Sequence, residues 1–252
     1  TQIMDKFCVD DIFKTVRGRV IASGLFAIVP LLGISYKGVP FDGSHGVQFL
    51  CFTAGVLQMG AYSYYAKAMR EQGADIVSAL WQTLPLYGCL AGVLFLGEVL
   101  SFLNVIGLLL ITGVTLFLCL PNHRMRFKKM VNKFAFRRVF VWMQIACILT
   151  LFATLSIDYA TLTTSTETVF FYYYIGHMVF AFMVLFINAP RFTHVKPTIK
   201  RPRLLLSLIV TMALIEALDG VGNYALIHAY KLGDYGLVTA MEALQPLVIL
   251  VL

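Results

Sequence analysis

Long apolar stretches alternate with short polar connections along nearly the whole chain. Each stretch holds about 18–25 nearly uncharged residues, enough for an α-helix to cross a hydrocarbon core ~30 Å thick. The eight predicted segments are 18–36, 46–67, 75–97, 101–120, 139–159, 168–188, 204–229 and 235–252. The pattern predicts an all-α, polytopic membrane protein whose helices are joined by brief loops.

Composition supports this class and excludes others. The chain is 59% apolar and 13% charged, with a mean hydropathy of +0.81, whereas soluble domains are about half apolar and about a quarter charged. No HExxH, GxSxG or Gly-rich phosphate loop is present, and the five cysteines form no CxxC pair. We therefore expect no enzyme, no cofactor and no metal site.

The basic residues indicate topology rather than nucleic-acid binding, because they lie between apolar stretches and form no stripe with exposed aromatics. When loops are assigned alternately to two sides, 18 Lys and Arg fall on one side and 2 on the other. The basic loops 122–138 and 191–203 belong to the first side. The positive-inside rule places these loops in the cytoplasm, with the protein in the cell (inner) membrane.

The chain also contains an internal repeat. An offset of 161 residues pairs Ala68 with Ala229, Val77 with Val238, Ala79 with Ala240, Pro85 with Pro246 and Leu86 with Leu247. We interpret residues 1–120 as a first repeat, 121–138 as a basic connecting loop and 139–252 as a second repeat. Five helices per repeat would give the halves opposite orientations, which is the architecture of secondary transporters with a midplane substrate site.

The stretch YYAKAMREQGADIVSALWQTLPLYGCLAGVLFLGEVLSFLNVIGLLLITGVTLFL (64–118) resembles the end of an EamA-type repeat of the drug/metabolite transporter superfamily. The resemblance implies a carrier of two such repeats, of which this chain would lack most of the first helix and all of the last. Members usually keep both termini in the cytoplasm. That usual topology would place the loops 122–138 and 191–203 outside the cytoplasm, opposite to the side that the distribution of Lys and Arg predicts.

Acidic residues inside apolar segments are the first candidates for function. Glu216 lies about 12 residues, or roughly 18 Å, from the basic end of its helix, near the bilayer centre. Asp219 and Asn223 follow on the same face, and Glu242 lies halfway along the next helix. An acid at the bilayer centre costs at least ~2.5 kcal/mol and usually faces a cavity or a partner. Burial favours its protonated form, so Glu216, Asp219 and Glu242 are predicted to couple transport to protons.

The first half has different residues at the equivalent positions. Gln58 corresponds to Asp219, Tyr62 to Asn223 and Trp81 to Glu242. An acid beside aromatic faces suits an organic cation through charge pairing and cation–π contact. The predicted substrate-binding set is Glu216, Asp219, Asn223, Glu242, Gln58, Tyr62, Trp81 and Gln245.

Pro85 and Pro246 occupy matching places inside predicted helices, where proline removes a backbone donor and bends the helix. We therefore predict two hinges. Gln82 and Gln245 lie within a turn of them and could bond the freed carbonyls or contact the substrate.

The resulting hypothesis is a secondary active transporter of small polar or cationic metabolites that works by alternating access and is coupled to protons or another ion. An intramembrane enzyme acting on a lipid-linked substrate and a non-transporting scaffold are the alternatives. In the scaffold, the acids would form a structural cluster, for example with His228 or a tyrosine. The Gly88–Gly92 GxxxG pair leaves a homodimer open.

Overall fold

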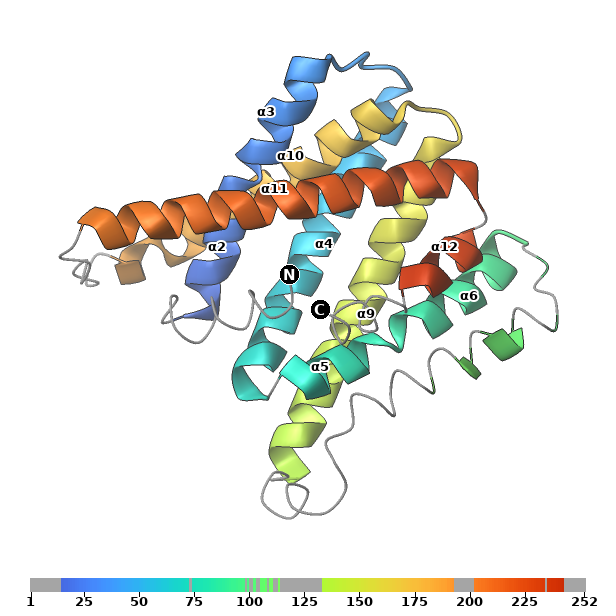
Figure 1. The fold of residues 1–252 in the computed structure, drawn as a ribbon, viewed down its shortest axis with the longest axis horizontal. Coiled ribbons are helices and arrows are strands. Elements are labelled where there is room, and N and C mark those ends of the chain that lie inside the picture. Colours follow the sequence, from blue (N-terminus) through green and yellow to red (C-terminus); the bar gives the residue numbers. More distant parts are fainter. Residues whose placement is uncertain are drawn as a thin grey trace.

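The computed structural model describes residues 15–72, 74–97, 133–192, 202–233 and 235–242, with a few single positions between 99 and 113. These residues form helices and turns, without a strand among them (Figure 1). The predicted segment 101–120 lies almost entirely outside the described residues. Gln245 and Pro246 lie outside them altogether.

Four long helices and one short helix agree with the predicted segments. The long ones are α4 (His45–Glu71), α9 (Lys133–Thr161), α10 (Thr166–Phe192) and α11 (Pro202–Leu232), and the short one is α12 (Tyr235–Glu242). The start of α9 falls within the stretch predicted as a loop. An all-α fold is therefore confirmed.

Two predicted segments are each broken into two helices. The first consists of α2 (Val16–Phe26) and α3 (Ile28–Lys37), and the second of α5 (Ala74–Trp81) and α6 (Leu84–Phe95). In both cases the earlier helix ends four residues before a proline, Pro30 or Pro85. A proline has no N–H for the carbonyl four residues back, so the helical ladder stops there.

A threonine lies at the break before Pro85. The hydroxyl of Thr83 donates to the carbonyl oxygen of Leu80 at 2.9 Å, while Pro85 lies at the start of α6. Gln82, which we expected either to bond a freed carbonyl or to contact the substrate, is buried, and its Oε1 has no hydrogen-bond partner in the described part of the chain. The helix is therefore interrupted beside Pro85, where the sequence predicts a bend.

The centre of the molecule is α4, which packs against α9 on one side and α10 on the other (Figure 1). Gly55 and Gly176 lie where α4 crosses α10. A Cβ atom on Gly55 would collide with the carbonyl oxygen of Tyr173, and one on Gly176 with the carbonyl oxygen of Phe52. Glycine at both positions lets the two backbones meet directly.

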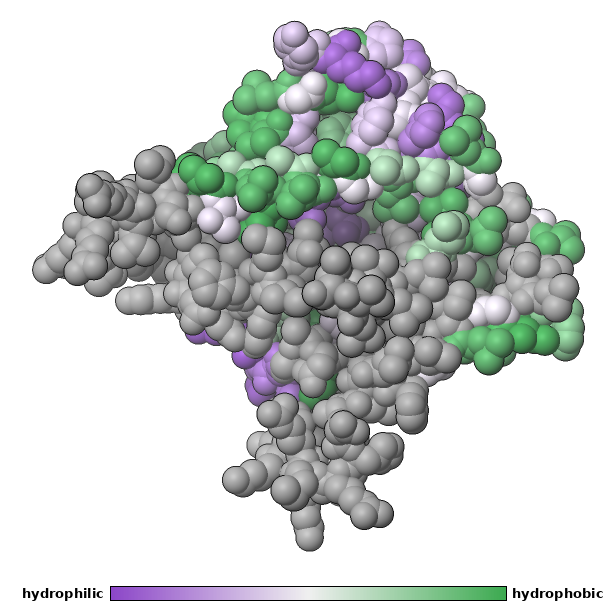
Figure 2. Space-filling model, in the orientation of Figure 1, coloured by the Kyte–Doolittle hydropathy of each residue, from purple (hydrophilic) through white to green (hydrophobic). Residues whose placement is uncertain are grey.

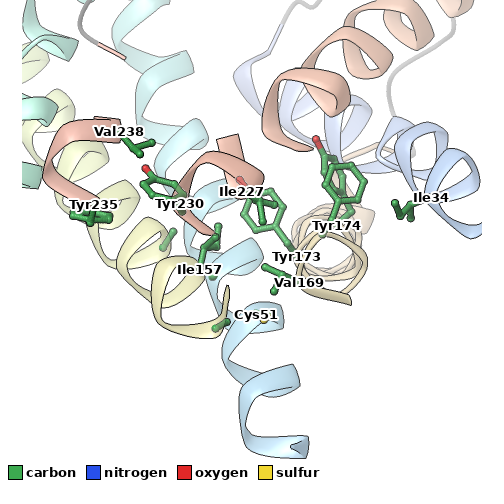
Figure 3. Close-up of a cluster of buried hydrophobic side chains, with 14 of the residues drawn as sticks. Ile34, Cys51, Ile157, Val169, Tyr173, Tyr174, Ile227, Tyr230, Tyr235 and Val238 are labelled. Carbon is green, nitrogen blue, oxygen red and sulfur yellow. The ribbon is translucent and has the colours of Figure 1, made fainter. Parts of the chain in front are cut away.

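Helix α11 crosses the front of α2, α3, α9 and α10, and α12 packs against α6 (Figure 1). The largest core cluster lies between these helices and contains Ile34, Cys51, Ile157, Tyr173 and Ile227 (Figure 3). Gly88, on which the predicted dimer contact rested, packs against the side chain of Thr239 on α12. A homodimer would therefore need another surface.

The outer faces of the helices are apolar, as expected of a protein surrounded by lipid. Within the described residues, four stretches are long and apolar enough to cross a membrane. They are Val16–Lys37, Arg137–Thr161, Thr166–Ile187 and Ile209–Leu232. Large apolar side chains are exposed along them, including Phe152, Phe186 and Val221. These spans indicate an integral, multi-pass membrane protein.

The helix boundaries recur at the offset found in the sequence. Helices α4 and α11 end at Glu71 and Leu232, and α5 and α12 begin at Ala74 and Tyr235, so each boundary returns 161 residues later. The break between α2 and α3 has no counterpart in α10, which is continuous.

Candidate functional site

A cavity of about 490 Å³ lies between α4, the α5–α6 break, α9, α10 and α11. Hydrophilic residues are visible in a recess along α11 in Figure 2. The lining residues are Gln58, Trp81, Leu84, Thr150, Thr154, Ile157, Tyr173, Leu218, Asp219, Gly222, Asn223, Leu226, Ile227 and Tyr230. Residues from both halves of the chain thus enclose one space of metabolite size.

Helix α11 supplies one wall of the cavity and, among the described lining residues, the one acid, Asp219. The lining positions from Leu218 to Tyr230 follow helical spacing, so they occupy one face of α11. Asp219 and Asn223 stand one turn apart on this face. The amide Nδ2 of Asn223 donates to the hydroxyl oxygen of Tyr174 on α10 at 2.8 Å, which fixes the orientation of the amide.

The other walls combine polar groups with aromatic faces. Gln58 of α4 and Trp81 of α5 were predicted from the sequence, and both line the cavity. Thr150, Tyr173 and Tyr230 also line it and were missed. Thr150 and Thr154 stand four residues apart in an apolar segment, a spacing that could have marked a polar face of α9.

Aromatic residues near a helix end often form a belt at the membrane interface. Tyr173, Tyr174 and His177, near the start of α10, are instead buried, as Figure 3 shows for the two tyrosines. The ring centroid of His177 lies 4.4 Å from that of Tyr173 and 5.0 Å from that of Tyr174. These rings pack inside the bundle because α10 is covered by α2, α4 and α11.

Glu216 does not line the cavity but lies one helical turn from Asp219 in a buried charge cluster. The hydroxyl of Ser23 on α2 donates to Oε1 of Glu216 at 2.6 Å. Nη1 of Arg19, also on α2, lies 3.6 Å from the same oxygen. The guanidinium carbon of Arg19 stands 5.5 Å from the ring centroid of Tyr62 on α4, so Tyr62 contacts the cluster.

This cluster corrects two expectations. We counted Arg19 among the charges of a cytoplasmic loop, but it lies in α2 and is only 1% exposed. The structural alternative paired the acids with His228, but His228 is exposed. Because other basic residues precede Arg19 in the sequence, the charge pattern did not distinguish it as a buried residue.

The end of the bundle opposite Arg19 is held by a second set of contacts between the two halves, which we call the Lys37 latch (Lys37, Asp42, Ser165, Glu167 and Tyr224). Nζ of Lys37 lies 2.7 Å from Oε1 of Glu167 and donates to the hydroxyl oxygen of Tyr224 at 2.7 Å. The Tyr224 hydroxyl in turn donates to Glu167 at 2.8 Å. Helices α3, α10 and α11 are thereby joined.

Asp42 extends the latch into the loop between α3 and α4. Its carboxylate accepts hydrogen bonds from the backbone N–H of Ser165 at 3.0 Å and from the Ser165 hydroxyl at 2.7 Å. Partial burial opposes ionisation of this carboxyl, but the hydrogen bonds from Ser165 and Thr168 outweigh it and hold the pKa of Asp42 below its usual 3.8. Ionised Asp42 therefore clamps the loop to the start of α10.

The remaining predicted residues fall outside what the structure describes. Glu242 is the last residue of α12, but its side chain is not among those described, and neither are Gln245 and Pro246. Within the described chain, no group of three His, Cys, Asp or Glu side chains is placed to hold a metal ion.

Comparison with known proteins identifies the first half of the chain. Residues 12–120 match the model of the EamA-like transporter family. This part of the chain is therefore similar to that family, in agreement with the resemblance in 64–118. Together with the four apolar spans, the match indicates a multi-pass membrane protein.

A solved structure, described only as the crystal structure of a protein, shares the fold. The two superpose with a TM-score of 0.68 over 99% of this chain and 85% of the other, at 13% sequence identity. At that identity the likeness shows the fold alone. Comparison with curated proteins gave no match.

Proposed function

We propose that the protein is a secondary active transporter of small polar or cationic metabolites, working by alternating access and coupled to protons. The observation that carries the proposal is the cavity of about 490 Å³, which holds Asp219 among amide, hydroxyl and aromatic groups. Acids inside membrane-spanning helices usually face a cavity or a partner and often mark substrate or ion pathways, and the negative charge of Asp219 attracts a cation.

The lining favours cations or neutral polar molecules over anions. Asp219 supplies negative charge, and the described lining residues include neither Lys nor Arg. Trp81, Tyr173 and Tyr230 present rings that can contact a cation, each worth ~0.5–2 kcal/mol. Net charge complementarity therefore points to organic cations, with hydrogen bonds to Gln58 and Asn223 fixing their orientation.

Alternating access follows from two five-helix repeats in opposite orientation. Support comes from helix boundaries that recur 161 residues later and from the cavity, whose walls come from both halves. Between the halves, the Lys37 latch holds one end and the Arg19–Glu216 pair holds α2 to α11. We propose that transport opens one set of contacts at a time, with Pro85 and Pro246 as bending points.

Coupling to protons requires that proton and substrate compete for the same acids. Asp219 faces the cavity and is the acid that would exchange a proton for a cationic substrate. Protonation of Glu216 would cancel its charge attraction to Arg19 and so loosen the tie between α2 and α11. Glu242 remains the third proposed coupling acid.

The test is proton flux in proteoliposomes that contain the complete protein. Amines, amino acids and nucleotide sugars are added in turn to wild type, Asp219→Asn and Glu216→Gln. The proposal expects flux with amines, abolished by Asp219→Asn while the protein stays folded. Substrate movement without proton flux would leave a facilitator, and absence of movement for all classes would reject the carrier.

The same purified protein distinguishes a carrier from the two alternative functions, an enzyme and a scaffold. An intramembrane enzyme would form product in detergent, without a sealed membrane. A scaffold would lose stability in Glu216→Gln but have no flux to lose. The proposed orientation, with the loops 122–138 and 191–203 in the cytoplasm of a cell with an inner membrane, is checked by labelling single cysteines in those loops from either side.

A further inference from the structure

Two buried polar atoms of cavity-lining residues have no hydrogen-bond partner within the described part of the chain. They are Oε1 of Gln58 on α4 and Oγ1 of Thr150 on α9. The Thr150 side chain is deeply buried, with the residue 4% exposed. Because nearly all buried polar groups in native proteins are paired, such atoms mark places where a ligand or a water belongs.

The conformation of Thr150 is unusual among the hydroxyl residues of these helices. Thr53, Ser63, Thr154 and Ser156 each donate to the carbonyl four residues earlier, at 2.8–3.0 Å. This bond is the ordinary local solution for a hydroxyl in a helix. Thr150 makes no such bond to Ala146, so its hydroxyl is left for a partner from outside the helix.

Gln58 and Thr150 belong to one wall. Helices α4 and α9 pack closely along their length. Near this level, a Cβ atom on Gly60 would stand 3.7 Å from Cδ1 of Leu149, so the two helices are in contact beside both residues. Asp219 and Asn223 line the cavity from another helix, α11.

We propose that Gln58 and Thr150 form a second polar subsite of the transport cavity, which binds an uncharged hydrogen-bonding group of the substrate while Asp219 binds its cationic group. The inference rests on the proposed function and narrows its substrate class. Oε1 of Gln58 accepts and Oγ1 of Thr150 donates or accepts. A hydroxyl or a primary amide satisfies both, so the substrate is an organic cation that carries one of these groups.

Discrimination between hydroxylated substrates and analogues that lack the hydroxyl should then depend on Thr150. A site built to hydrogen-bond a hydroxyl rejects the analogue that lacks it, because the site's own polar groups are left unpaired. Thr150→Val keeps the shape of the side chain and removes the hydroxyl. It should lower the preference for hydroxylated substrates over analogues that lack the hydroxyl.

The experiment compares tyramine with phenethylamine, and ethanolamine with propylamine, in proteoliposomes of the complete protein. Wild type, Thr150→Val and Thr53→Val are assayed for uptake, and Thr53 is the control because it lies outside the cavity lining and bonds Phe49. Wild type should prefer the hydroxylated member of at least one pair by about tenfold or more. Thr150→Val should bring that ratio close to one, chiefly by lowering uptake of the hydroxylated member, while Thr53→Val should keep the wild-type ratio.

Equal preference in wild type, or an unchanged ratio in Thr150→Val, would overturn the subsite and assign the two atoms to bound water. Failure of the proposed function is read separately, from amine binding to the protein in detergent. The fluorescence of Trp81 reports binding in a Trp142→Phe background, since the chain has 2 tryptophans. Binding that discriminates by hydroxyl without uptake keeps the subsite and rejects the carrier, whereas no binding of any of the four amines rejects the subsite.

Discussion

The buried pair Arg19–Glu216 allows the most quantitative prediction. The two residues are 1% and 4% exposed, and Nη1 lies 3.6 Å from Oε1. At an effective dielectric constant of about 20, unit charges at this separation attract by about 4–5 kcal/mol. Removing one partner leaves an uncompensated buried charge, which typically costs ~3–5 kcal/mol. We expect Arg19→Met and Glu216→Gln each to destabilise the protein by this amount.

The double variant Arg19→Met/Glu216→Gln should lose much less unfolding free energy than the two single variants lose in sum. Neither residue is then charged, so the desolvation cost disappears together with the attraction. The hydrogen bond from Ser23 then goes to an uncharged oxygen and is weaker, and some packing is lost, at about 1–2 kcal/mol in total. The coupling energy between the two sites should therefore exceed about 2 kcal/mol.

The assay is unfolding of the four proteins in detergent by denaturant, with thermal unfolding as a second reading. Each single substitution should lower the midpoint temperature by roughly 6–20 °C. Arg70→Met serves as the control, because Arg70 is an exposed arginine at the end of α4. Single effects below about 1 kcal/mol that add in the double variant would refute the buried pair.

Three further predictions follow from other contacts. Gly176→Leu should lower the unfolding temperature strongly because its side chain would enter the backbone of α4, whereas Gly33→Leu has no atom within 4 Å of the new Cβ and should be mild. For Asp42, a pKa held below 3.8 in the folded protein means that its stabilising effect is complete at higher pH and is lost as the pH falls through the folded value. The protection of the Ser165 amide from hydrogen exchange, relative to its intrinsic rate at each pH, should therefore fall in acid for wild type, and Asp42→Asn should be poorly protected already at neutral pH; equal protection in both proteins would contradict the clamp. In a background without native cysteines, a disulfide between Asp42→Cys and Ser165→Cys should stop uptake reversibly, and full uptake in the oxidised protein would show that the Lys37 latch need not open.

The sequence predicted the fold well because a bilayer permits few alternatives. Long uncharged segments that cross a bilayer must satisfy their backbone hydrogen bonds internally, so they form helices. Helix α5 ends four residues before Pro85, because proline has no N–H to bond the carbonyl at that position. The boundary of α9 was less predictable, since a basic stretch such as Lys133–Arg138 can form either a loop or a helix end. The break at Ala27 could have been foreseen from Pro30, which stands four residues after the end of α2.

The site was predicted only in part. Gln58, Trp81, Asp219 and Asn223 line the cavity as expected, because polar residues in apolar helices have few other places to go. Which charge meets which acid depends on how α2 packs on α11, and no local pattern encodes that. The sequence therefore assigned Arg19 to a loop. It also did not predict that Thr150 lines a cavity, because Thr150 lies in a mostly apolar segment.

The central claim is that Asp219 binds a cationic substrate that moves across a sealed membrane. Solute counterflow tests it most directly: vesicles loaded with unlabelled tyramine are diluted into labelled tyramine, with wild type, Asp219→Glu and Asp219→Asn compared. We predict transient accumulation of label for wild type, partial accumulation for Asp219→Glu and none for Asp219→Asn, with all three proteins folded. Accumulation by Asp219→Asn equal to that of wild type would contradict the account.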